Sequence, residues 1–217
     1  MNGEKFRNTF ISIKGILGLI EAKDVAIPEI QRPFVWKNSQ VRDLIDSLYK
    51  GYPTGYIILW KNPNVKLKDG TISSGKKVII DGQQRITALM TAVAAQKVFN
   101  NEFKECRVKI AFNPFAALDY ANGNNEAEIF AVQTPAHLKS KYWIPDISEI
   151  FSTSFSSWTF IPKYIEQNPN MTGEDLQVVL NTLKGIEAFQ MGVIELSENR
   201  DIDVVTDLFI RITSKGS

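Results

Sequence analysis

The stretch from Val78 to Val93 constrains the fold of this chain most, because its pattern of apolar residues changes partway along. Residues 78–80 form a short continuous apolar run, which is typical of a strand buried on both faces. Asp81-Gly82 is a turn dipeptide. The apolar residues that follow have the spacing of one helix face: Ile86, Leu89, Met90 and Val93. The stretch therefore predicts a strand, a tight turn and a helix.

The start of this helix is a candidate anion site. Gln83, Gln84 and Arg85 fall at or just before its first turn, where backbone N–H groups have no acceptor within the helix and carry the positive end of its dipole. Such a turn, beside a guanidinium and two carboxamides, suits a phosphate. Asp-Gly also favours hairpins, but the helical period that follows argues against one. A solvated helix start that binds nothing is the alternative, and spacing alone leaves both open.

Length and composition limit the class of protein to which this chain can belong. The chain has 217 residues, of which 44% are hydrophobic and 23% charged, so it suits one large domain or one domain and part of a second. A net charge of +1 indicates no whole-chain footprint for nucleic acid, although a local basic patch stays open. Cys106 is the only cysteine, which indicates a reducing compartment. Because no transmembrane run or signal peptide is visible, we expect a soluble cytoplasmic protein.

Residues 27–36 predict an extended segment that carries functional side chains. Pro28 and Pro33 disfavour a helix there. In an extended segment Arg32, Phe34 and Trp36 share one side and Gln31 takes the other. We expect the aromatic residues to fasten the segment to the core and Arg32 to point at a site.

Local patterns of apolar residues, caps and turns predict the other elements. Helices are expected at residues 9–23 with Ser12 as a cap, from Asn38 to Gly51, from Thr172 through Leu183, and from Asp201 onward. Strands are expected at residues 25–27, 56–60, 107–112, 129–132 and 190–196. Residues 61–75 predict a polar loop, residues 113–126 a loop around a short helix, and residues from Trp143 a helical region. His137 has no second ligand candidate nearby, so it is expected to face solvent rather than bind a metal.

Four stretches resemble the GmrSD-type N-terminal domains, which stand at the front of modification-dependent restriction enzymes and related anti-phage proteins. Residues 27–36 resemble the family's Ile-Pro-x-x-Gln-Arg-x-[Phe/Tyr]-x-Trp segment, and residues 51–60 its Gly-Tyr-Pro-x-Gly entry to a strand. Residues 81–87 are similar to its Asp-Gly-Gln-Gln-Arg signature, and residues 209–216 to its Phe-x-Arg-x-Asn-x-x-Gly element. Thr213 stands where the family usually has Asn. The resemblance runs from about residue 10 to the end.

The resemblance implies an α/β (α+β) fold with a ParB/sulfiredoxin-like core, a small mixed sheet with helices, and a helical C-terminal portion. We expect a single domain over residues 1–217, with a core at about 10–112 and an elaboration at about 113–217. We also expect that the natural protein continues beyond residue 217. In full-length relatives an HNH nuclease domain or subunit often follows, and any DNA would be met through the full-length protein.

The resemblance also implies binding of a nucleoside triphosphate (GTP or ATP) and its hydrolysis with Mg²⁺. Gly82 would let the backbone approach phosphate closely. The side chains of Gln83 and Gln84 would donate to phosphate oxygens, and Arg85 would do so with two bonds.

More distant residues are expected to complete this site. Arg32 and Arg211, with Gln31, would converge on the nucleotide and stabilise charge on the leaving group. Asp81 would orient a water molecule or hold a hydrated Mg²⁺ ion, and no other metal ligand is predicted. Its alternative role is to cap the helix from the turn.

The residues and the resemblance together predict a regulatory domain that binds nucleotide, and the resemblance implies that it also hydrolyses it. The alternative is a non-enzymatic ParB-like module that binds DNA or protein and uses nucleotide only as a conformational ligand. A nuclease in its own right is disfavoured, because no paired carboxylates and no positioned histidine are visible. Homo-oligomerisation is left open.

Overall fold

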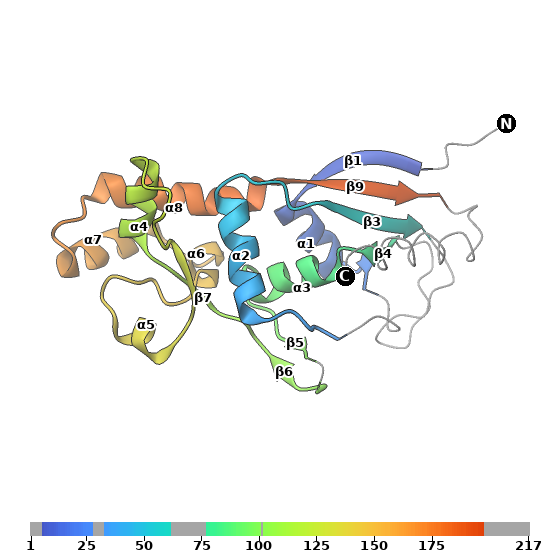
Figure 1. Cartoon of the computed structure of the whole chain (residues 1–217), viewed down its shortest axis with the longest axis horizontal. Helices are drawn as coiled ribbons and strands as arrows, with labels where there is room; N and C mark the ends of the chain where they lie inside the picture. The colour runs from blue at the N-terminus through green and yellow to red at the C-terminus, as the bar shows by residue number, and fades with distance from the viewer. Residues whose placement is uncertain (1–5, 28–32, 62–76, 101, 198–217) are drawn as a thin grey trace. The chain divides into compact units, whose positions relative to one another are not determined.

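The computed structural model describes residues 6–27, 33–61, 77–100 and 102–197 (Figure 1). Within these ranges the fold is mixed α/β, with one five-stranded mixed sheet and eight α-helices. The predicted fold class is therefore confirmed. Expectations for Gln31, Arg32, Arg211 and Thr213 lie outside the described residues, as do those for most of the loop after Lys61 and for the last helix.

The chain divides into two compact units. Unit 1 contains residues 1–32, 55–83 and 190–217, and unit 2 contains residues 33–54 and 84–189. The chain therefore passes between the units at four places, and three of them fall within or beside the stretches that resemble the family. Each unit is described by itself below.

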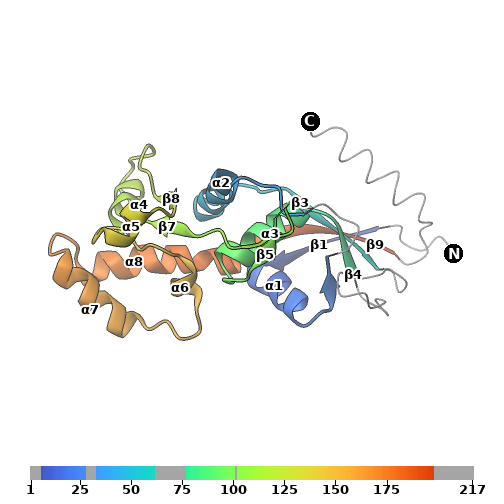
Figure 2. The same ribbon diagram turned by 90° about the horizontal axis from the view of Figure 1, so that it is seen from below.

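The sheet belongs to unit 1 and has the strand order β1-β9-β3-β4-β2. Figure 1 labels the first four of these strands in that order, and Figure 2 shows them from below. Its strands are β1 (Phe6–Ser12), β2 (Val25–Ala26), β3 (Tyr56–Lys61), β4 (Lys77–Asp81) and β9 (Gln190–Leu196). β1 is antiparallel to β9, β9 is parallel to β3, β3 is antiparallel to β4, and β4 is parallel to β2. Four of these strands confirm predicted ones.

β1 was not predicted, and it corrects the start of the first helix. Residues 9–12 belong to β1, and helix α1 spans Ile13–Glu21. Pairing with β9 along all seven residues of β1 holds this segment extended. Ser12 is the cap as expected, because its Oγ accepts from the backbone N–H of Gly15 at 3.0 Å.

The centre of the sheet explains the apolar run in β4. Ile79 has no exposed surface, and Val78 and Ile80 are 1% and 8% exposed. Val78 and Ile80 share a buried cluster with side chains of the neighbouring strands: Ile58, Trp60 and Leu196. Because β4 has partners on both sides and both of its faces are covered, the sequence needs apolar residues at all three central positions, 78–80.

Unit 2 is built mainly of helices, which are α2 (Asn38–Tyr49), α3 (Gln83–Ala92), α4 (Pro114–Ala121), α5 (Pro135–Lys139), α6 (Ser148–Phe151), α7 (Ser157–Gln167) and α8 (Gly173–Lys184), followed by a 3₁₀ turn (Gly185–Ala188). Its short strands pair as β5 (Val98–Phe99) with β6 (Glu105–Cys106), and β7 (Ile110–Phe112) with β8 (Phe130–Val132). Helices α2 and α8 each bury one apolar face, formed by Val41, Leu44, Ile45 and Leu48 in α2 and by Leu176, Val179, Leu180 and Leu183 in α8.

The strand expected at residues 107–112 is shorter than predicted. Only β7 pairs with β8, whereas Glu105–Cys106 forms β6. The intervening residues have other partners, because the N–H of Val108 donates to Thr91 Oγ1 at 2.8 Å and the side chain of Arg107 bonds to Asp146. Tertiary contacts therefore interrupt an alternating pattern that is continuous in the sequence.

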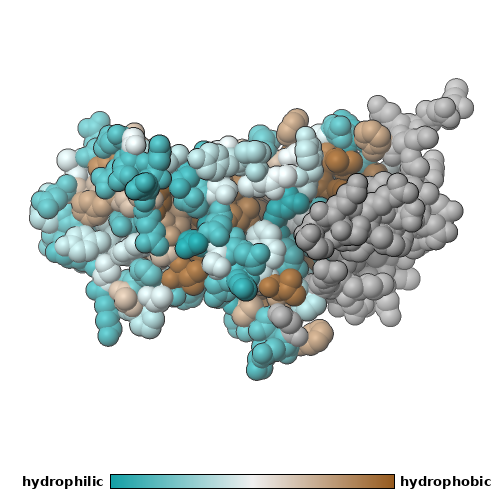
Figure 3. Space-filling model, in the orientation of Figure 1, coloured by the Kyte–Doolittle hydropathy of each residue, from teal (hydrophilic) through white to brown (hydrophobic). Residues whose placement is uncertain are grey.

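The face of unit 2 shown in Figure 3 is mostly hydrophilic, with hydrophobic residues in small groups. Apolar area on that face is therefore dispersed, as is normal for a folded domain. Among the described residues, no helix is both long enough and apolar enough to cross a membrane.

Candidate functional site

The candidate site is the turn that joins β4 to α3. β4 ends at Asp81, and α3 begins at Gln83. Gly82, between them, has φ of +89°, a conformation that favours glycine. The sharp turn brings the chain directly from a buried strand into a ten-residue helix, so the first N–H groups of α3 lie immediately after β4. The chemistry that such a turn offers is anion binding.

Asp81 ends β4 and is half-buried. It pairs with Ile58 of β3, beside a register shift between Ile58 and Leu59. Irregularities of this kind re-aim side chains and are frequent beside functional sites. The position is compatible with both expected roles of Asp81.

Gln83 is 8% exposed and ties the start of α3 back to β4. Its Nε2 donates to the carbonyl of Ile79 at 2.9 Å. A buried carboxamide needs such a partner, because an unpaired one costs free energy. The first glutamine of the signature therefore has a structural bond within unit 1.

Gln84 binds the extended segment that follows Arg32. Its Oε1 accepts from the N–H of Val35 at 3.0 Å, and its Nε2 donates to the carbonyl of Pro33 at 3.2 Å. One side chain thus satisfies both backbone groups as a neighbouring strand would. Phe34, between them, is buried and bridges to Asn100, so its predicted anchoring role is confirmed.

Arg85 binds the second stretch that resembles the family. Its Nη1 donates to the carbonyl of Thr54 at 2.6 Å. Thr54 precedes Gly55, whose φ is +83°. Because a guanidinium is planar and carries five N–H donors, this bond also fixes the plane of the other donors.

The structure thus gathers parts of three stretches that are far apart in the sequence. Gln84 and Arg85 join the third stretch to Pro33 and Val35 of the first and to Thr54 of the second. Asp81, Gly82 and Gln83 lie just before them along the chain. The bonds described here are bonds within the protein, and a role of these residues at the nucleotide stays a prediction.

The residues at this turn fit a hydrated magnesium ion better than a closed metal centre. The described part of the chain contains no group of three or more His, Cys, Asp or Glu side chains that could hold a metal ion. Mg²⁺ usually keeps several waters and binds one or two carboxylates together with substrate phosphates. Asp81 could supply one such carboxylate.

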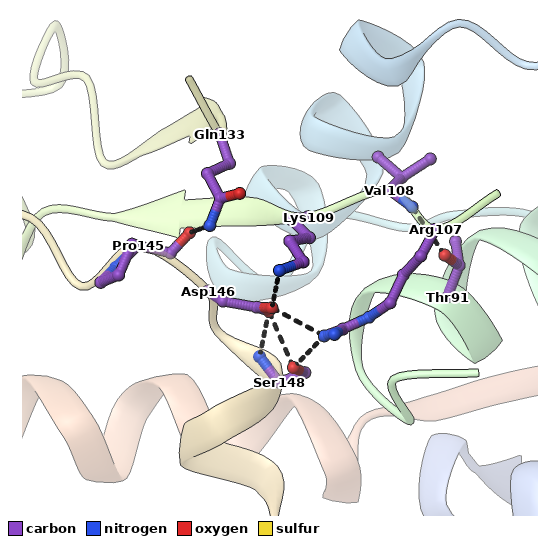
Figure 4. Close-up of polar contacts among 8 residues, drawn as sticks. All are labelled: Thr91, Arg107, Val108, Lys109, Gln133, Pro145, Asp146 and Ser148. Atoms are coloured by element: carbon purple, nitrogen blue, oxygen red, sulfur yellow. Dashed lines mark hydrogen bonds and ion pairs between the residues drawn. The ribbon is translucent and has the colours of Figure 1, made fainter. Parts of the chain in front are cut away.

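Sequence reasoning missed a buried polar network in unit 2 (Figure 4). Asp146 is 3% exposed and accepts from Arg107 Nη2 at 2.7 Å and from the hydroxyl of Ser148 at 2.7 Å. Arg107 also donates to Ser148, and Lys109 Nζ lies 3.9 Å from Asp146. The network joins residues 107–109 to the start of α6. The Asp-x-Ser pattern before α6 was the available signal, because an aspartate there can accept from a backbone N–H two residues on.

A shallow groove of about 290 Å³ lies elsewhere in unit 2, between α2 and residues 125–130. Its charged side chains on α2 pair with each other, Arg42 with Asp43 and Lys50 with Asp46. None of the predicted site residues lines it.

His137 is half-buried and less exposed to solvent than expected. Its Nδ1 accepts from the N–H of Thr134 at 3.0 Å, and its ring centroid lies 4.7 Å from that of Trp143. The histidine therefore caps the first turn of α5.

Comparisons with known proteins identify the family of this chain. The family model described as the N-terminal domain of GmrSD restriction endonucleases matches residues 13–217. An uncharacterized protein of Methanocaldococcus jannaschii is 28% identical over 102 residues, which cover 37% of this chain and 17% of that protein. The match thus spans less than a fifth of the relative's length. Because the family model covers nearly the whole sequence, this chain belongs to the GmrSD restriction endonuclease N-terminal domain family.

Proposed function

We propose that this domain binds a nucleoside triphosphate with its phosphates at the first turn of α3. The observation that carries the proposal is the turn at Gly82, where a φ of +89° lets a buried strand lead directly into a helix start. Helix starts of this kind bind phosphate through backbone N–H groups and the helix dipole. The triphosphate would be GTP or ATP.

We further propose that the domain hydrolyses the nucleotide and so regulates a modification-dependent restriction enzyme. Asp81 would orient the attacking water or a hydrated Mg²⁺ ion. Arg85 would contact phosphate, and Gln31, Arg32 and Arg211 would reach the nucleotide from other parts of the chain. When bound, Mg²⁺ would neutralise charge on the phosphate oxygens. The nuclease and the contact with DNA would belong to the full-length protein.

The first experiment titrates the domain with ATP and with GTP, each with Mg²⁺, by calorimetry and follows phosphate release in parallel. The informative variant is Gly82→Ala, in which a side chain meets strained backbone and intrudes where phosphate would approach. Its matched control is Gly123→Ala, because Gly123 has φ of +101° and open space around an added Cβ. Both variants carry similar backbone strain, roughly 1–2 kcal/mol.

We expect Gly82→Ala to lose at least about ten-fold in affinity and Gly123→Ala to bind as the wild type does. The proposal is wrong if the wild-type domain binds neither nucleotide, or if both variants bind equally well.

One observation favours the non-enzymatic alternative. Gln83 and Gln84 already have backbone partners, as expected if the signature mainly builds the fold and nucleotide is only a conformational ligand. In that case the titration would show binding of nucleotide without phosphate release.

A further inference from the structure

Three of the four connections between the units begin, on the unit 2 side, at residues of one hydrogen-bonded cluster. Residues Pro33, Thr54 and Gln84 each stand at the unit 2 side of a crossing. Gln84 bonds to Pro33 and Val35, and Arg85 bonds to Thr54. We call these five residues the clasp. All of its members and all of these bonds belong to unit 2.

The clasp holds the segment after Arg32 from one side, and another strand holds it from the other. The N–H of Phe34 donates to the carbonyl of Phe99 at 3.1 Å. The flanking carbonyl of Pro33 and N–H of Val35 point to Gln84 instead. Successive backbone groups of this segment thus bond alternately to one side and to the other, as in a strand between two neighbouring strands. The carboxamide of Gln84 takes the place of one of those neighbours.

We propose that Gln84 is a positioning residue for the nucleotide site, an inference that rests on the proposed function. Adjacent Cα atoms are only about 3.8 Å apart, so fixing Pro33 limits how far the neighbouring residue in the chain, Arg32, can lie from the clasp. Fixing Thr54 does the same for Gly55, and Gln84 lies two residues after Gly82. The clasp therefore holds the starting points of several segments that would approach the nucleotide, and the side chain of Gln84 acts through those segments.

The chemistry of the clasp is selective for a carboxamide at residue 84. A carboxamide donates and accepts at once, which the carbonyl of Pro33 and the N–H of Val35 require. An ionised carboxylate can only accept, so it would accept from the N–H of Val35 and repel the carbonyl oxygen of Pro33. A protonated carboxyl group can again donate and accept. The variant Gln84→Glu can therefore be switched by pH.

The experiment measures two properties of Gln84→Glu, each at pH 7.5 and pH 5. The first is affinity for ATP and for GTP with Mg²⁺, relative to the wild type at the same pH. The second is the hydrogen-exchange protection factor of the Val35 amide without nucleotide. The control is Gln40→Glu, because the bond that caps α2 is made by the oxygen of Gln40, which accepts from the N–H of Lys37 at 2.8 Å. A carboxylate preserves that bond.

At pH 7.5 we expect Gln84→Glu to lose about ten-fold or more both in affinity and in the protection of Val35. At pH 5 both should return toward wild-type values, because the neighbouring carbonyl of Pro33 favours the protonated carboxyl and so raises its pKa above the ordinary value of about 4.3. This recovery would also demonstrate that the variant is folded. Gln40→Glu should match the wild type at both pH values.

Two outcomes would overturn the positioning role while leaving the proposed function intact. In one, affinity falls but Val35 protection is unchanged, which would make Gln84 a direct ligand. In the other, Val35 protection falls but affinity is retained, which would make the clasp only structural. A wild-type domain that binds neither nucleotide would instead overturn the proposed function, and the positioning role with it.

Discussion

At the scale of single residues, the Asp-Gly-Gln-Gln-Arg signature has a structural role and a proposed role at the nucleotide. Gln83, Gln84 and Arg85 were expected to face phosphate, and the structure gives each of them a backbone carbonyl as partner. An arginine carries five N–H donors, so a bond to the carbonyl of Thr54 does not exclude a contact between Arg85 and phosphate. Arg85 can therefore hold Thr54 and also contact a ligand.

Arg85→Ala should lower the affinity for triphosphate by roughly ten- to a hundred-fold, because a hydrogen bond to a charged group is worth roughly 1.5–3 kcal/mol. The fold should persist, since Arg85 is half-buried beside the apolar face of α3. Calorimetry measures the affinity, and Arg42→Ala is the control, because Arg42 pairs with its exposed neighbour Asp43. An unchanged affinity in Arg85→Ala would refute the role.

Asp81→Asn separates chemistry from capping. If Asp81 orients water or Mg²⁺, the variant should bind triphosphate but release little phosphate. Asparagine caps helices about as well as aspartate, so a purely capping residue would tolerate the change. Single-turnover phosphate release decides between them, and normal turnover would argue against a catalytic role.

At the scale of elements, the network around Asp146 fastens the start of α6 to residues 107–109. Asp146→Ala should lower the free energy of unfolding by roughly 1.5–3 kcal/mol, because it leaves Arg107 and Lys109 without their buried carboxylate. Urea denaturation measures the loss. Asp43→Ala is the matched control, because its ion pair is exposed and such pairs contribute little. Equal losses in both variants would count against the network.

Helix α2 ends in a residue that makes stability depend on pH. Burial, and then the nearby Tyr120, raise the pKa of Tyr49 to about 12. In the unfolded chain the phenol ionises near its ordinary value of about 10, so the unfolded state loses its proton first. The stabilising contribution is therefore complete below pH 10 and is lost as pH rises toward 12.

Tyr49→Phe should reduce this alkaline loss of stability, and Tyr52→Phe should not, because Tyr52 is 56% exposed. Denaturant unfolding at pH 9 and pH 11.5 compares the variants. Identical alkaline losses in wild type and Tyr49→Phe would contradict the assignment.

At the scale of the whole molecule, nucleotide would influence the end of the chain. A ligand shifts a conformational equilibrium only if it binds the two states differently. We expect Arg211 to make that difference by contacting phosphate. Triphosphate should then raise the hydrogen-exchange protection of residues 201–217, while the isolated domain turns over slowly. Equal protection in free and saturated samples would mean that this end is not coupled to the site.

The sequence by itself determined the elements whose signals are local. An unbroken apolar run predicts β4. Thr172 predicts the start of α8, and in the structure its Oγ1 accepts from the N–H of Asp175 at 3.1 Å. The turn at Gly82 follows from the change of period beside a turn dipeptide. Each of these patterns depends on residues within a few positions of each other, where backbone geometry alone decides which side chains share a face.

Only the tertiary structure decided the features that depend on distant partners. β1 exists because β9 pairs with it, although the paired residues lie 178 to 190 positions apart in the sequence. The strand expected at residues 107–112 stops short because Arg107 and Val108 bond elsewhere. Gln84 meets Pro33 across 51 positions and Arg85 meets Thr54 across 31. A glutamine or an arginine in a sequence shows only what it can donate or accept. Which carbonyl takes the bond depends on how the folded chain brings the two groups together.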